Sequence, residues 1–269
     1  MTATDPTPAT PARTGVVVVA AGSGTRLGRG MPKALVPLAG RPLLAHALQG
    51  IIDSGVADEL VVVLPPNDDR LEDICREAAE RTGTLVATVR GGAERNDSVR
   101  AGLAALDRVD HVLVHDAARC LTPAAVFSRI AAAVAAGGIA VVPGVPVADT
   151  IKAVEPAPAA ALHTPAATLG IPDAAVVTGT PDRSGLRAIQ TPQGFDAAAL
   201  AAAHQLAARG GRGAAAAVTD DAGVMERAGH SVLVVPGDPA AFKITTAQDL
   251  LLAEAILARQ DAATPTQET

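Results

Sequence analysis

Four short segments of the 269-residue sequence carry residue types that can bind phosphates or metal ions. The first is a glycine-rich stretch that follows an apolar run and contains Gly22, Gly24 and Gly28. Glycines in this position let backbone N–H groups approach a phosphate chain closely. Arg26 lies within the stretch and Lys33 follows it. Two cations beside such a turn could neutralise a triphosphate, and the alternative is an ordinary tight turn with two solvated charges.

The spacing of these glycines excludes two common nucleotide-binding motifs. The pattern Gly-x-Gly-x-x-x-Gly is one residue longer than the Rossmann fingerprint, and the Lys-Ser/Thr pair of a Walker A motif is absent. An NAD-dependent oxidoreductase is therefore disfavoured.

The second segment runs from Gly92 to Ser98, after an apolar run and at the start of a predicted helix. The unpaired N–H groups of a helix N-terminus bind anions or polar edges. Ordinary capping of the helix is the alternative.

The third and fourth segments place charged residues at the ends of apolar runs. Asp116 ends one such run, and Mg²⁺ prefers carboxylate and phosphate oxygens, so Asp116 is a candidate metal ligand. The alternative for Asp116 is that it only caps the following turn. Arg119 could pair with Asp116 or with a substrate phosphate. Lys243 precedes the last predicted helix and could complete a cationic clamp, although an isolated lysine there is more often solvated.

The elements that must position these residues alternate along the chain. Short apolar runs without polar alternation predict strands covered on both faces, at residues 16–20, 60–64, 85–89, 111–115, 139–142 and 232–235. Amphipathic patterns predict helices at residues 43–53, 69–81, 94–106, 123–136 and 246–259, with Thr122 as an N-cap before Pro123 and a capping box from Thr246 to Asp249. The fold class is therefore α/β, with a mostly parallel twisted sheet and helices on both faces.

We expect one α/β domain at residues 14–260, between a disordered leader (1–13) and a disordered tail (261–269). Residues 149–190 are rich in Pro and Ala and interrupt the alternation, which predicts an inserted antiparallel arm with a loose tip near residues 156–172. Neither a signal peptide nor a membrane-spanning run is expected.

Composition narrows the function classes. Aromatic residues make up only 1% of the chain, and the formal net charge is −6. Stacking platforms for single-stranded nucleic acid need aromatic rings, and a nucleic-acid footprint needs an extended basic surface. We therefore expect no nucleic-acid partner. Two cysteines make neither a disulfide framework nor a zinc site, which favours a reducing, cytoplasmic location.

Taken together, these segments resemble the 2-C-methyl-D-erythritol 4-phosphate cytidylyltransferase family over residues 15–259. The residues that carry the resemblance are Ala20, Ala21, Gly22, Gly24, Arg26, Pro32, Lys33, Gly92, Glu94, Arg95, Ser98, Val99, His115, Asp116, Ala117, Ala118, Arg119, Thr191, Pro192, Gln193, Thr219, Asp220, Lys243, Ile244 and Thr245. Many nucleotidyltransferases share the glycine-rich start and the Pro-Lys pair. The combination of His-Asp-Ala-Ala-Arg with Thr-Pro-Gln and Lys-Ile-Thr is much narrower.

The resemblance implies transfer of CMP from CTP to a phosphorylated polyol, with Mg²⁺, in the cytoplasm, by a homodimer of the non-mevalonate isoprenoid pathway. It implies a catalytic set of Arg26, Lys33 and Lys243, and nucleotide contacts from Ala20, Ala21, Gly22, Gly24, Gly92 and Ser98. It also implies substrate contacts from Asp116 (which could instead hold the metal), Arg119 and Thr219, and from the arm residues Thr150 and Arg183.

The sequence departs from the family pattern at a few positions. Ala93 replaces a frequent acidic residue, Ala34 a Gln, Cys120 a Pro and Gly223 a small polar residue, and the arm is long between residues 156 and 182. No departure removes a charge that the chemistry needs. A cytidylyltransferase for another pentitol or sugar phosphate, and a nucleotide-binding regulator without catalysis, remain as alternatives.

Overall fold

The computed structural model describes residues 11–22, 24, 27–66, 68–156, 175–209 and 219–263. Arg26 and most of the expected leader, arm tip and tail lie outside these ranges. The chain divides into two compact units, residues 1–143 with 190–269, and residues 144–189. The second unit nearly coincides with the insertion expected at residues 149–190.

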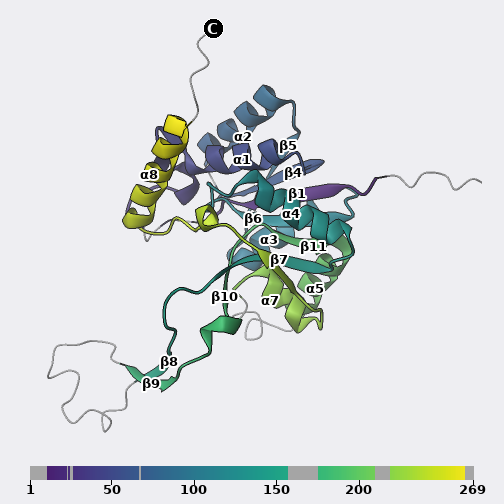
Figure 1. Cartoon of the computed structure of the whole chain (residues 1–269). Coiled ribbons are helices and arrows are strands. Elements are labelled where there is room, and N and C mark those ends of the chain that lie inside the picture. Colours follow the sequence, from purple (N-terminus) through teal and green to yellow (C-terminus); the bar gives the residue numbers. More distant parts are fainter. Residues whose placement is uncertain are drawn as a thin grey trace, which may run out of the picture. The chain divides into compact units, whose positions relative to one another are not determined.

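A twisted sheet forms the centre of the first unit (Figure 1). Its strands are β1 (Thr14–Val19), β4 (Glu59–Leu64), β5 (Val86–Arg90), β6 (His111–Asp116), β7 (Ala140–Pro146) and β11 (Gln193–Asp196), in the order β7-β11-β6-β1-β4-β5. Strands β6, β1, β4 and β5 are parallel, whereas β11 runs antiparallel to both β6 and β7. β12 (Leu233–Pro236) also pairs with β7. The expected mostly parallel sheet is confirmed.

The four parallel strands β1, β4, β5 and β6 contribute to two hydrophobic cores, because successive side chains of a strand point to opposite faces. In β1, Val16 and Val18 belong to one core and Val17 to the other. Helices α1 (Leu43–Ser54), α2 (Asp69–Thr82), α4 (Ala124–Ala135) and α8 (Ala247–Ala263) pack against the first core, and α3 (Arg95–Ala104), α5 (Ala197–Arg209) and α7 (Asp221–Arg227) against the second. Coverage of both faces explains why the strands lack polar alternation.

Of the two N-terminal caps predicted from the sequence, the one at α8 is confirmed and the one at α4 is wrong. Thr246 and Asp249 form the expected capping box, with the Asp249 N–H donating to Thr246 Oγ1 and the Thr246 N–H to Asp249 Oδ2. The assignment of Thr122 as the N-cap of α4 is wrong. Pro123 occupies that position. The Thr122 hydroxyl instead donates to the Arg119 carbonyl at 2.7 Å, and this hydrogen bond closes the turn before α4.

Several elements were not predicted. Among them are β11, β10 (Arg187–Ile189), the helices α5 and α7, and a small hairpin of β2 (Pro37–Leu38) and β3 (Arg41–Pro42). Helix α8 also continues to Ala263, past the expected end at Arg259. At the other terminus, Arg13, the last residue of the expected leader, forms an ion pair with Glu59 at 2.7 Å.

The second unit contains the expected antiparallel pair of strands. They are β8 (Ala153–Pro156) and β9 (Ala175–Gly179), and Lys152 donates to Thr180 beside them at 2.7 Å. The short strand β10 (Arg187–Ile189) pairs antiparallel with residues 144–146 of β7. The tip between β8 and β9 lies outside the described residues.

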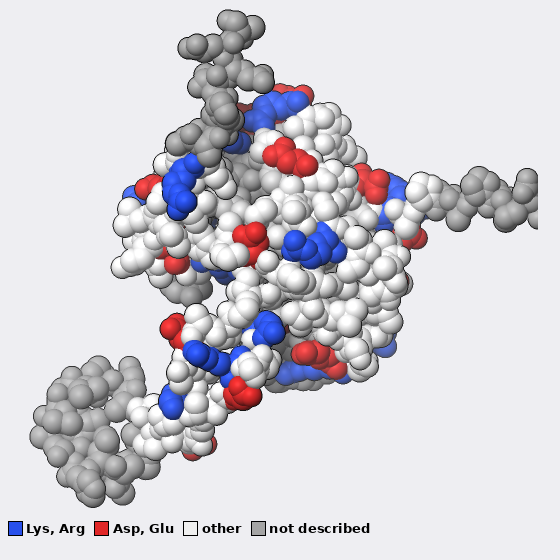
Figure 2. Space-filling view, in the orientation of Figure 1, with Lys and Arg blue, Asp and Glu red and all other residues white. Residues whose placement is uncertain are grey.

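No helix in the described residues is long and apolar enough to span a bilayer. Cys75 and Cys120 are both buried free thiols. Figure 2 shows small separate groups of acidic and basic side chains on the face in view, without a continuous basic band.

Candidate active site

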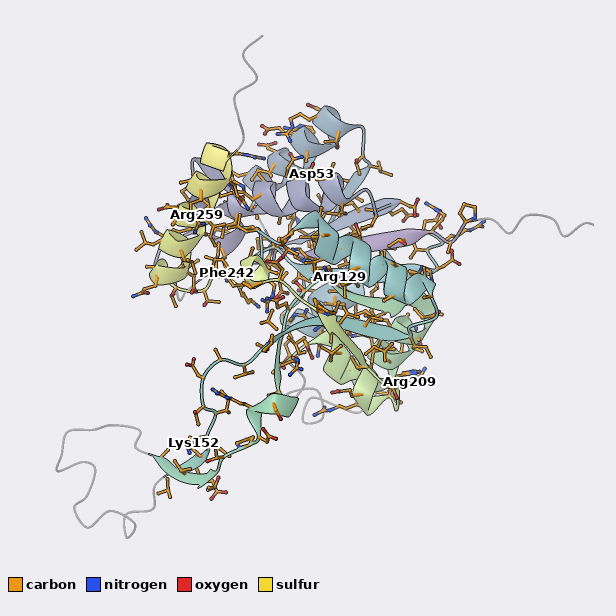
Figure 3. All side chains as sticks on the ribbon, viewed as in Figure 1. Asp53, Arg129, Lys152, Arg209, Phe242 and Arg259 are labelled. Carbon is orange, nitrogen blue, oxygen red and sulfur yellow. The ribbon has the colours of Figure 1, made fainter. Side chains whose placement is uncertain are left out.

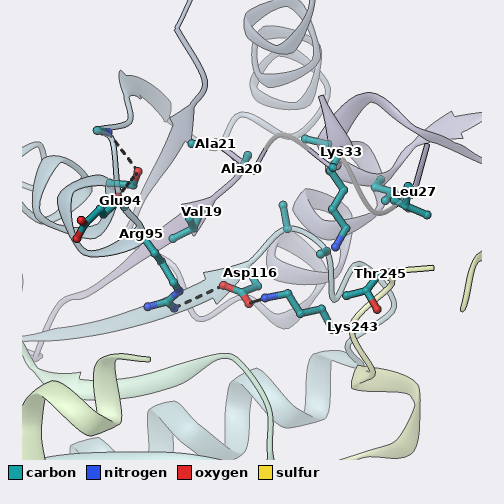
Figure 4. Close-up of a pocket in the computed structure, with 18 of the residues that line it drawn as sticks. Val19, Ala20, Ala21, Leu27, Lys33, Glu94, Arg95, Asp116, Lys243 and Thr245 are labelled. Atoms are coloured by element: carbon teal, nitrogen blue, oxygen red, sulfur yellow. Dashed lines mark hydrogen bonds and ion pairs between the residues drawn. The ribbon is translucent and has the colours of Figure 1, made fainter. Parts of the chain in front are cut away.

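A pocket of about 470 Å³ lies at the carboxyl end of β1 and β6 (Figure 4). Ligands of open α/β sheets bind at this edge, because the loops that follow the parallel strands meet there. The pocket brings together Lys33, Asp116 and Lys243, which are far apart in the sequence. It is also lined by the six predicted nucleotide-binding residues, Ala20, Ala21, Gly22, Gly24, Gly92 and Ser98.

The other predicted site residues lie elsewhere or outside the described chain. Arg26 is not among the described residues, and Arg119 and Thr219 are not among the described residues that line the pocket. Thr150 and Arg183 belong to the second unit, where Arg183 donates to the Ala148 carbonyl. The proposed roles of these five residues stay predictions.

Asp116 is the last residue of β6, and both of its carboxylate oxygens bind cations. Lys243 Nζ donates to Oδ2 at 2.6 Å, and Arg95 Nη2 approaches Oδ1 at 3.5 Å. Burial opposes ionisation of Asp116, but the charges of Arg95 and Lys243 outweigh it and hold the pKa of this carboxyl well below its ordinary value. The pocket therefore contains a carboxylate that is charged at neutral pH and lies between two cations.

The backbone beneath Asp116 is fixed by the Thr-Pro-Gln segment. The Asp116 N–H donates to Thr191 Oγ1 at 3.0 Å, and the same oxygen contacts His115 Nδ1 at 3.0 Å. The ring of His115 lies 4.9 Å from that of Phe127 in the core below. Thr191 is therefore a positioning residue, since its hydroxyl holds the strand end that carries Asp116.

Lys33 depends on the glycine-rich turn for its position. Gly24 has a φ of +69°, and a Cβ on it would lie 2.9 Å from Lys33 Cβ. The Lys33 N–H donates to the Gly22 carbonyl at 3.3 Å. Only a glycine meets both the positive φ and the close approach. The lysine is thus held directly against the turn, with its side chain in the pocket.

The segment from Gly92 to Ser98 caps α3 and lines the pocket at the same time. Glu94 and Asp97 form a capping box, and a Cβ on Gly92 would lie 2.2 Å from Asp97 Cβ. Ser98 Oγ accepts from the Gly92 N–H and donates to the Glu94 carbonyl, both at 3.2 Å. These two hydrogen bonds hold the first turn of α3 against the Gly92 backbone.

Lys243 follows the 3-10 helix η5 (Pro239–Ala241) and Phe242, which Figure 3 labels. Arg119 Nη1 donates to the Ala241 carbonyl at 2.7 Å and so holds this connection. On the other side, Asp249 accepts from the Thr245 N–H and hydroxyl at 2.7 and 2.8 Å. The loop that carries Lys243 is therefore fastened at both ends.

The sequence reasoning assigned no role to Arg95, although the residue stands in the second segment. Its guanidinium lines the pocket, contacts Asp116 and donates to Asp221 at 2.8 Å. Among the departures from the family pattern, Ala34 and Ala93 also line the pocket. Cys120 is buried, and burial raises the pKa of its thiol to about 12, so it is unreactive at neutral pH.

The described residues do not form a metal site of their own. No group of three or more His, Cys, Asp or Glu side chains in the described ranges could hold an ion. Mg²⁺ at Asp116 would have to share its oxygens with Lys243 and Arg95, and no second carboxylate in the described ranges joins Asp116 as a ligand. The donor set at Asp116 therefore does not fit a resident Mg²⁺.

The arrangement is suited to binding anions. Three cationic side chains, Lys33, Arg95 and Lys243, line the pocket together with backbone from two glycine-containing segments. Such groups stabilise negative charge that develops during phosphoryl transfer.

The buried His115 gives a prediction about stability against pH. Burial lowers the pKa of His115 to about 4, whereas an unfolded histidine titrates near 6.5. The unfolded chain therefore takes up a proton between about pH 6.5 and pH 4 that the folded protein does not, and stability is lost as the pH falls through this window. Lowering the pH from 7 to 5 should cost the wild type about 2 kcal/mol more unfolding free energy than His115→Asn, whose amide can still contact Thr191. Urea denaturation at both pH values measures this, and equal losses in the two proteins would contradict it.

Comparison with known proteins places this chain in a family. A family model described as 2-C-methyl-D-erythritol 4-phosphate cytidylyltransferase matches residues 14–259. A protein of that name from Nocardia farcinica is 47% identical over 246 residues, which are 91% of this chain and 94% of the relative, and one from Rhodococcus jostii is 46% identical over 90% of this chain and 93% of the relative.

Solved structures agree. The crystal structure of the 4-diphosphocytidyl-2C-methyl-D-erythritol synthase from Anaerococcus prevotii is 28% identical, with a TM-score of 0.74 over 92% of this chain and 97% of that one. The 2-C-methyl-D-erythritol 4-phosphate cytidylyltransferase from Thermus thermophilus is 34% identical, with a TM-score of 0.66 over 91% and 99%. This chain belongs to the 2-C-methyl-D-erythritol 4-phosphate cytidylyltransferase family.

Proposed function

We propose that this protein transfers CMP from CTP to 2-C-methyl-D-erythritol 4-phosphate and releases pyrophosphate, a step of non-mevalonate isoprenoid precursor biosynthesis. The observation that carries the proposal is the convergence of Lys33 and Lys243 on one pocket beside the glycine-rich turn, in a chain of this family. The acceptor's phosphate oxygen attacks the α-phosphorus of CTP, and the bond from that phosphorus to the pyrophosphate leaving group breaks.

The proposed reaction needs cations and alignment, and it needs no general base. A phosphomonoester carries about −1.5 to −2 charges near neutral pH, so the nucleophile arrives ionised. The difficulty is the approach of two anions, which positive groups relieve by neutralising the phosphates and by fixing the line of attack. Lys33 and Lys243 supply two such groups, and we propose Arg26 as a third.

The remaining assignments follow from the family. We propose that the backbone of residues 20–24, with Gly92 and Ser98, holds the nucleotide, and that Asp116, Arg119 and Thr219 contact the acceptor. Thr150 and Arg183 of the second unit are proposed to bind the acceptor phosphate across a homodimer. A cytoplasmic location is part of the same proposal.

Product identification tests the proposal. Incubation with CTP, MgCl₂ and 2-C-methyl-D-erythritol 4-phosphate should release pyrophosphate and yield the cytidine diphosphate adduct of the acceptor. Release of pyrophosphate with another pentitol phosphate instead would assign a different acceptor. No release with any acceptor, while CTP still binds, would identify a regulator.

Removal of either pocket lysine should slow turnover strongly. Lys33→Ala and Lys243→Ala should each lower kcat by ~10²-fold or more, which is the usual loss when one charge-stabilising donor is removed. Steady-state release of pyrophosphate measures this. Arg129→Ala, an exposed cation on α4 that Figure 3 labels, serves as the control and should turn over normally. Near-normal kcat in both lysine variants would contradict the proposed clamp.

We further propose that Mg²⁺ enters this pocket on the phosphates of CTP, since the part of the chain that the structure describes offers it no complete site. EDTA should abolish turnover, and added MgCl₂ should restore it. In thermal unfolding, MgCl₂ alone should leave Tm unchanged, whereas MgCl₂ with CTP should raise it, because only a species that binds the folded state stabilises it. A clear rise in Tm with MgCl₂ alone, absent with KCl of equal ionic strength, would contradict the proposal.

A further inference from the structure

A fully buried carboxylate lies behind the pocket and has no part in the proposed reaction. Asp221 is the first residue of α7 and is 0% exposed. It has two side-chain partners: His204 Nε2 on α5 contacts Oδ1 at 3.0 Å, and Arg95 Nη1 donates to Oδ2 at 2.8 Å. A carboxylate this deeply buried is costly unless it is paired, so its position depends on these two residues.

Arg95 joins this buried carboxylate to the pocket. Its two terminal nitrogens are divided between carboxylates, with Nη1 on Asp221 at 2.8 Å and Nη2 on Asp116 at the looser distance of 3.5 Å. Burial tends to lower the pKa of Arg95, but Asp221 and Asp116 raise it on balance, so the guanidinium stays charged. The closer contact is therefore the one away from the pocket.

This division matters because Asp116 also holds Lys243. A guanidinium and a carboxylate prefer a bidentate pair of parallel hydrogen bonds. If Asp221 did not hold Nη1, Arg95 could turn both nitrogens toward Asp116 and compete with Lys243 for the Asp116 carboxylate. Asp221 thus leaves Asp116 Oδ2 to Lys243, which donates to it at 2.6 Å.

Hydrogen bonds from Gln193 and Asp220 hold the backbone at the start of α7, where Asp221 lies. Gln193 Nε2 donates to Asp220 Oδ2 at 2.8 Å, and Gln193 Oε1 accepts from the Ala222 N–H at 3.1 Å. Asp220 Oδ1 also accepts from the Gly223 N–H at 3.0 Å. Gln193 and Asp220 belong to the motifs that resemble the family, but the sequence assigned them no role. In the structure they hold the residues on both sides of Asp221.

We propose that Asp221, oriented by His204, is a positioning residue that holds Arg95 and thereby sets the Asp116–Lys243 pair for the transfer step. The inference rests on the proposed function, because it names residues that prepare that same pocket. It predicts that Asp221 influences turnover only through Arg95.

A double-mutant cycle tests this dependence. Asp221→Asn, Arg95→Met and the double variant are compared with the wild type for kcat and for the acceptor KM, with CTP and MgCl₂ in excess. Each single variant should lose about tenfold or more in kcat/KM, as expected for loss of a hydrogen bond between charged groups. The kcat/KM of the double variant should lie within about threefold of that of Arg95→Met, because Asp221 is expected to act only through Arg95.

Two further variants separate positioning from folding. Asp68→Asn is the matched control, since Asp68 is also buried and also pairs with an arginine, Arg70, at 2.7 Å. It should leave kcat/KM within about threefold of the wild type. If Asp221→Asn does not fold, His204→Leu replaces it in the cycle, because it removes the donor to Asp221. His204→Gln keeps a hydrogen-bond donor, so it should recover most of the kcat/KM that His204→Leu loses.

The outcomes are distinct. Losses that multiply in the double variant, or an Asp221→Asn protein with normal kcat/KM, overturn the positioning role and leave the proposed function intact. A folded wild type that releases no pyrophosphate from CTP and the acceptor overturns the proposed function, and the positioning role falls with it. Non-additive losses with a normal Asp68→Asn support the inference.

Discussion

The candidate site depends on the ion pairs that keep Asp116 charged inside the pocket. Burial of a lone carboxylate there would favour its protonated form, and Lys243 and Arg95 brought close without it would repel each other. The three charges therefore stabilise one another, with Asp116 between the two cations. They come from the end of β6, the start of α3 and the connection before α8, so one interaction ties together three distant parts of the chain.

The sheet explains why these parts meet. β1 and β6 are adjacent and parallel, and Val19 at the end of β1 is paired with Asp116. The glycine-rich turn and Asp116 must then leave the sheet at the same edge. The antiparallel strand β11 adds Thr191 just before it, whose hydroxyl binds the Asp116 backbone. The parallel strands therefore bring the charges together, and β11 fixes the strand end that carries one of them.

Sequence patterns predicted the parallel strands and most of their helices, because apolar runs are local signals. The resemblance to the family implied one site for Arg26, Lys33, Asp116 and Lys243, and the last three meet in the pocket, whereas Arg26 lies outside the described residues. β11 was missed, since Gln193–Asp196 is only four residues long and its pairing with β6 and β7 is a long-range property. α5 was missed because an alanine-rich segment has little apolar contrast between its faces. The role of Asp221 was out of reach for a similar reason: its partners are 17 and 126 residues away, and a lone acidic residue gives no sign that it is buried.

The charge arrangement also explains how an acidic protein can hold two anions. The chain has a formal net charge of −6, yet the described residues that line the pocket include Lys33, Arg95 and Lys243. Asp116 offsets part of this positive charge and holds two of the cations at fixed places before any ligand arrives. In the proposed reaction, triphosphate oxygens carry more negative charge than one carboxylate, so they can share these cations without the side chains having to move far. Stabilisation by groups already in place costs little reorganisation at the moment of transfer, which is the condition under which such charges are most effective.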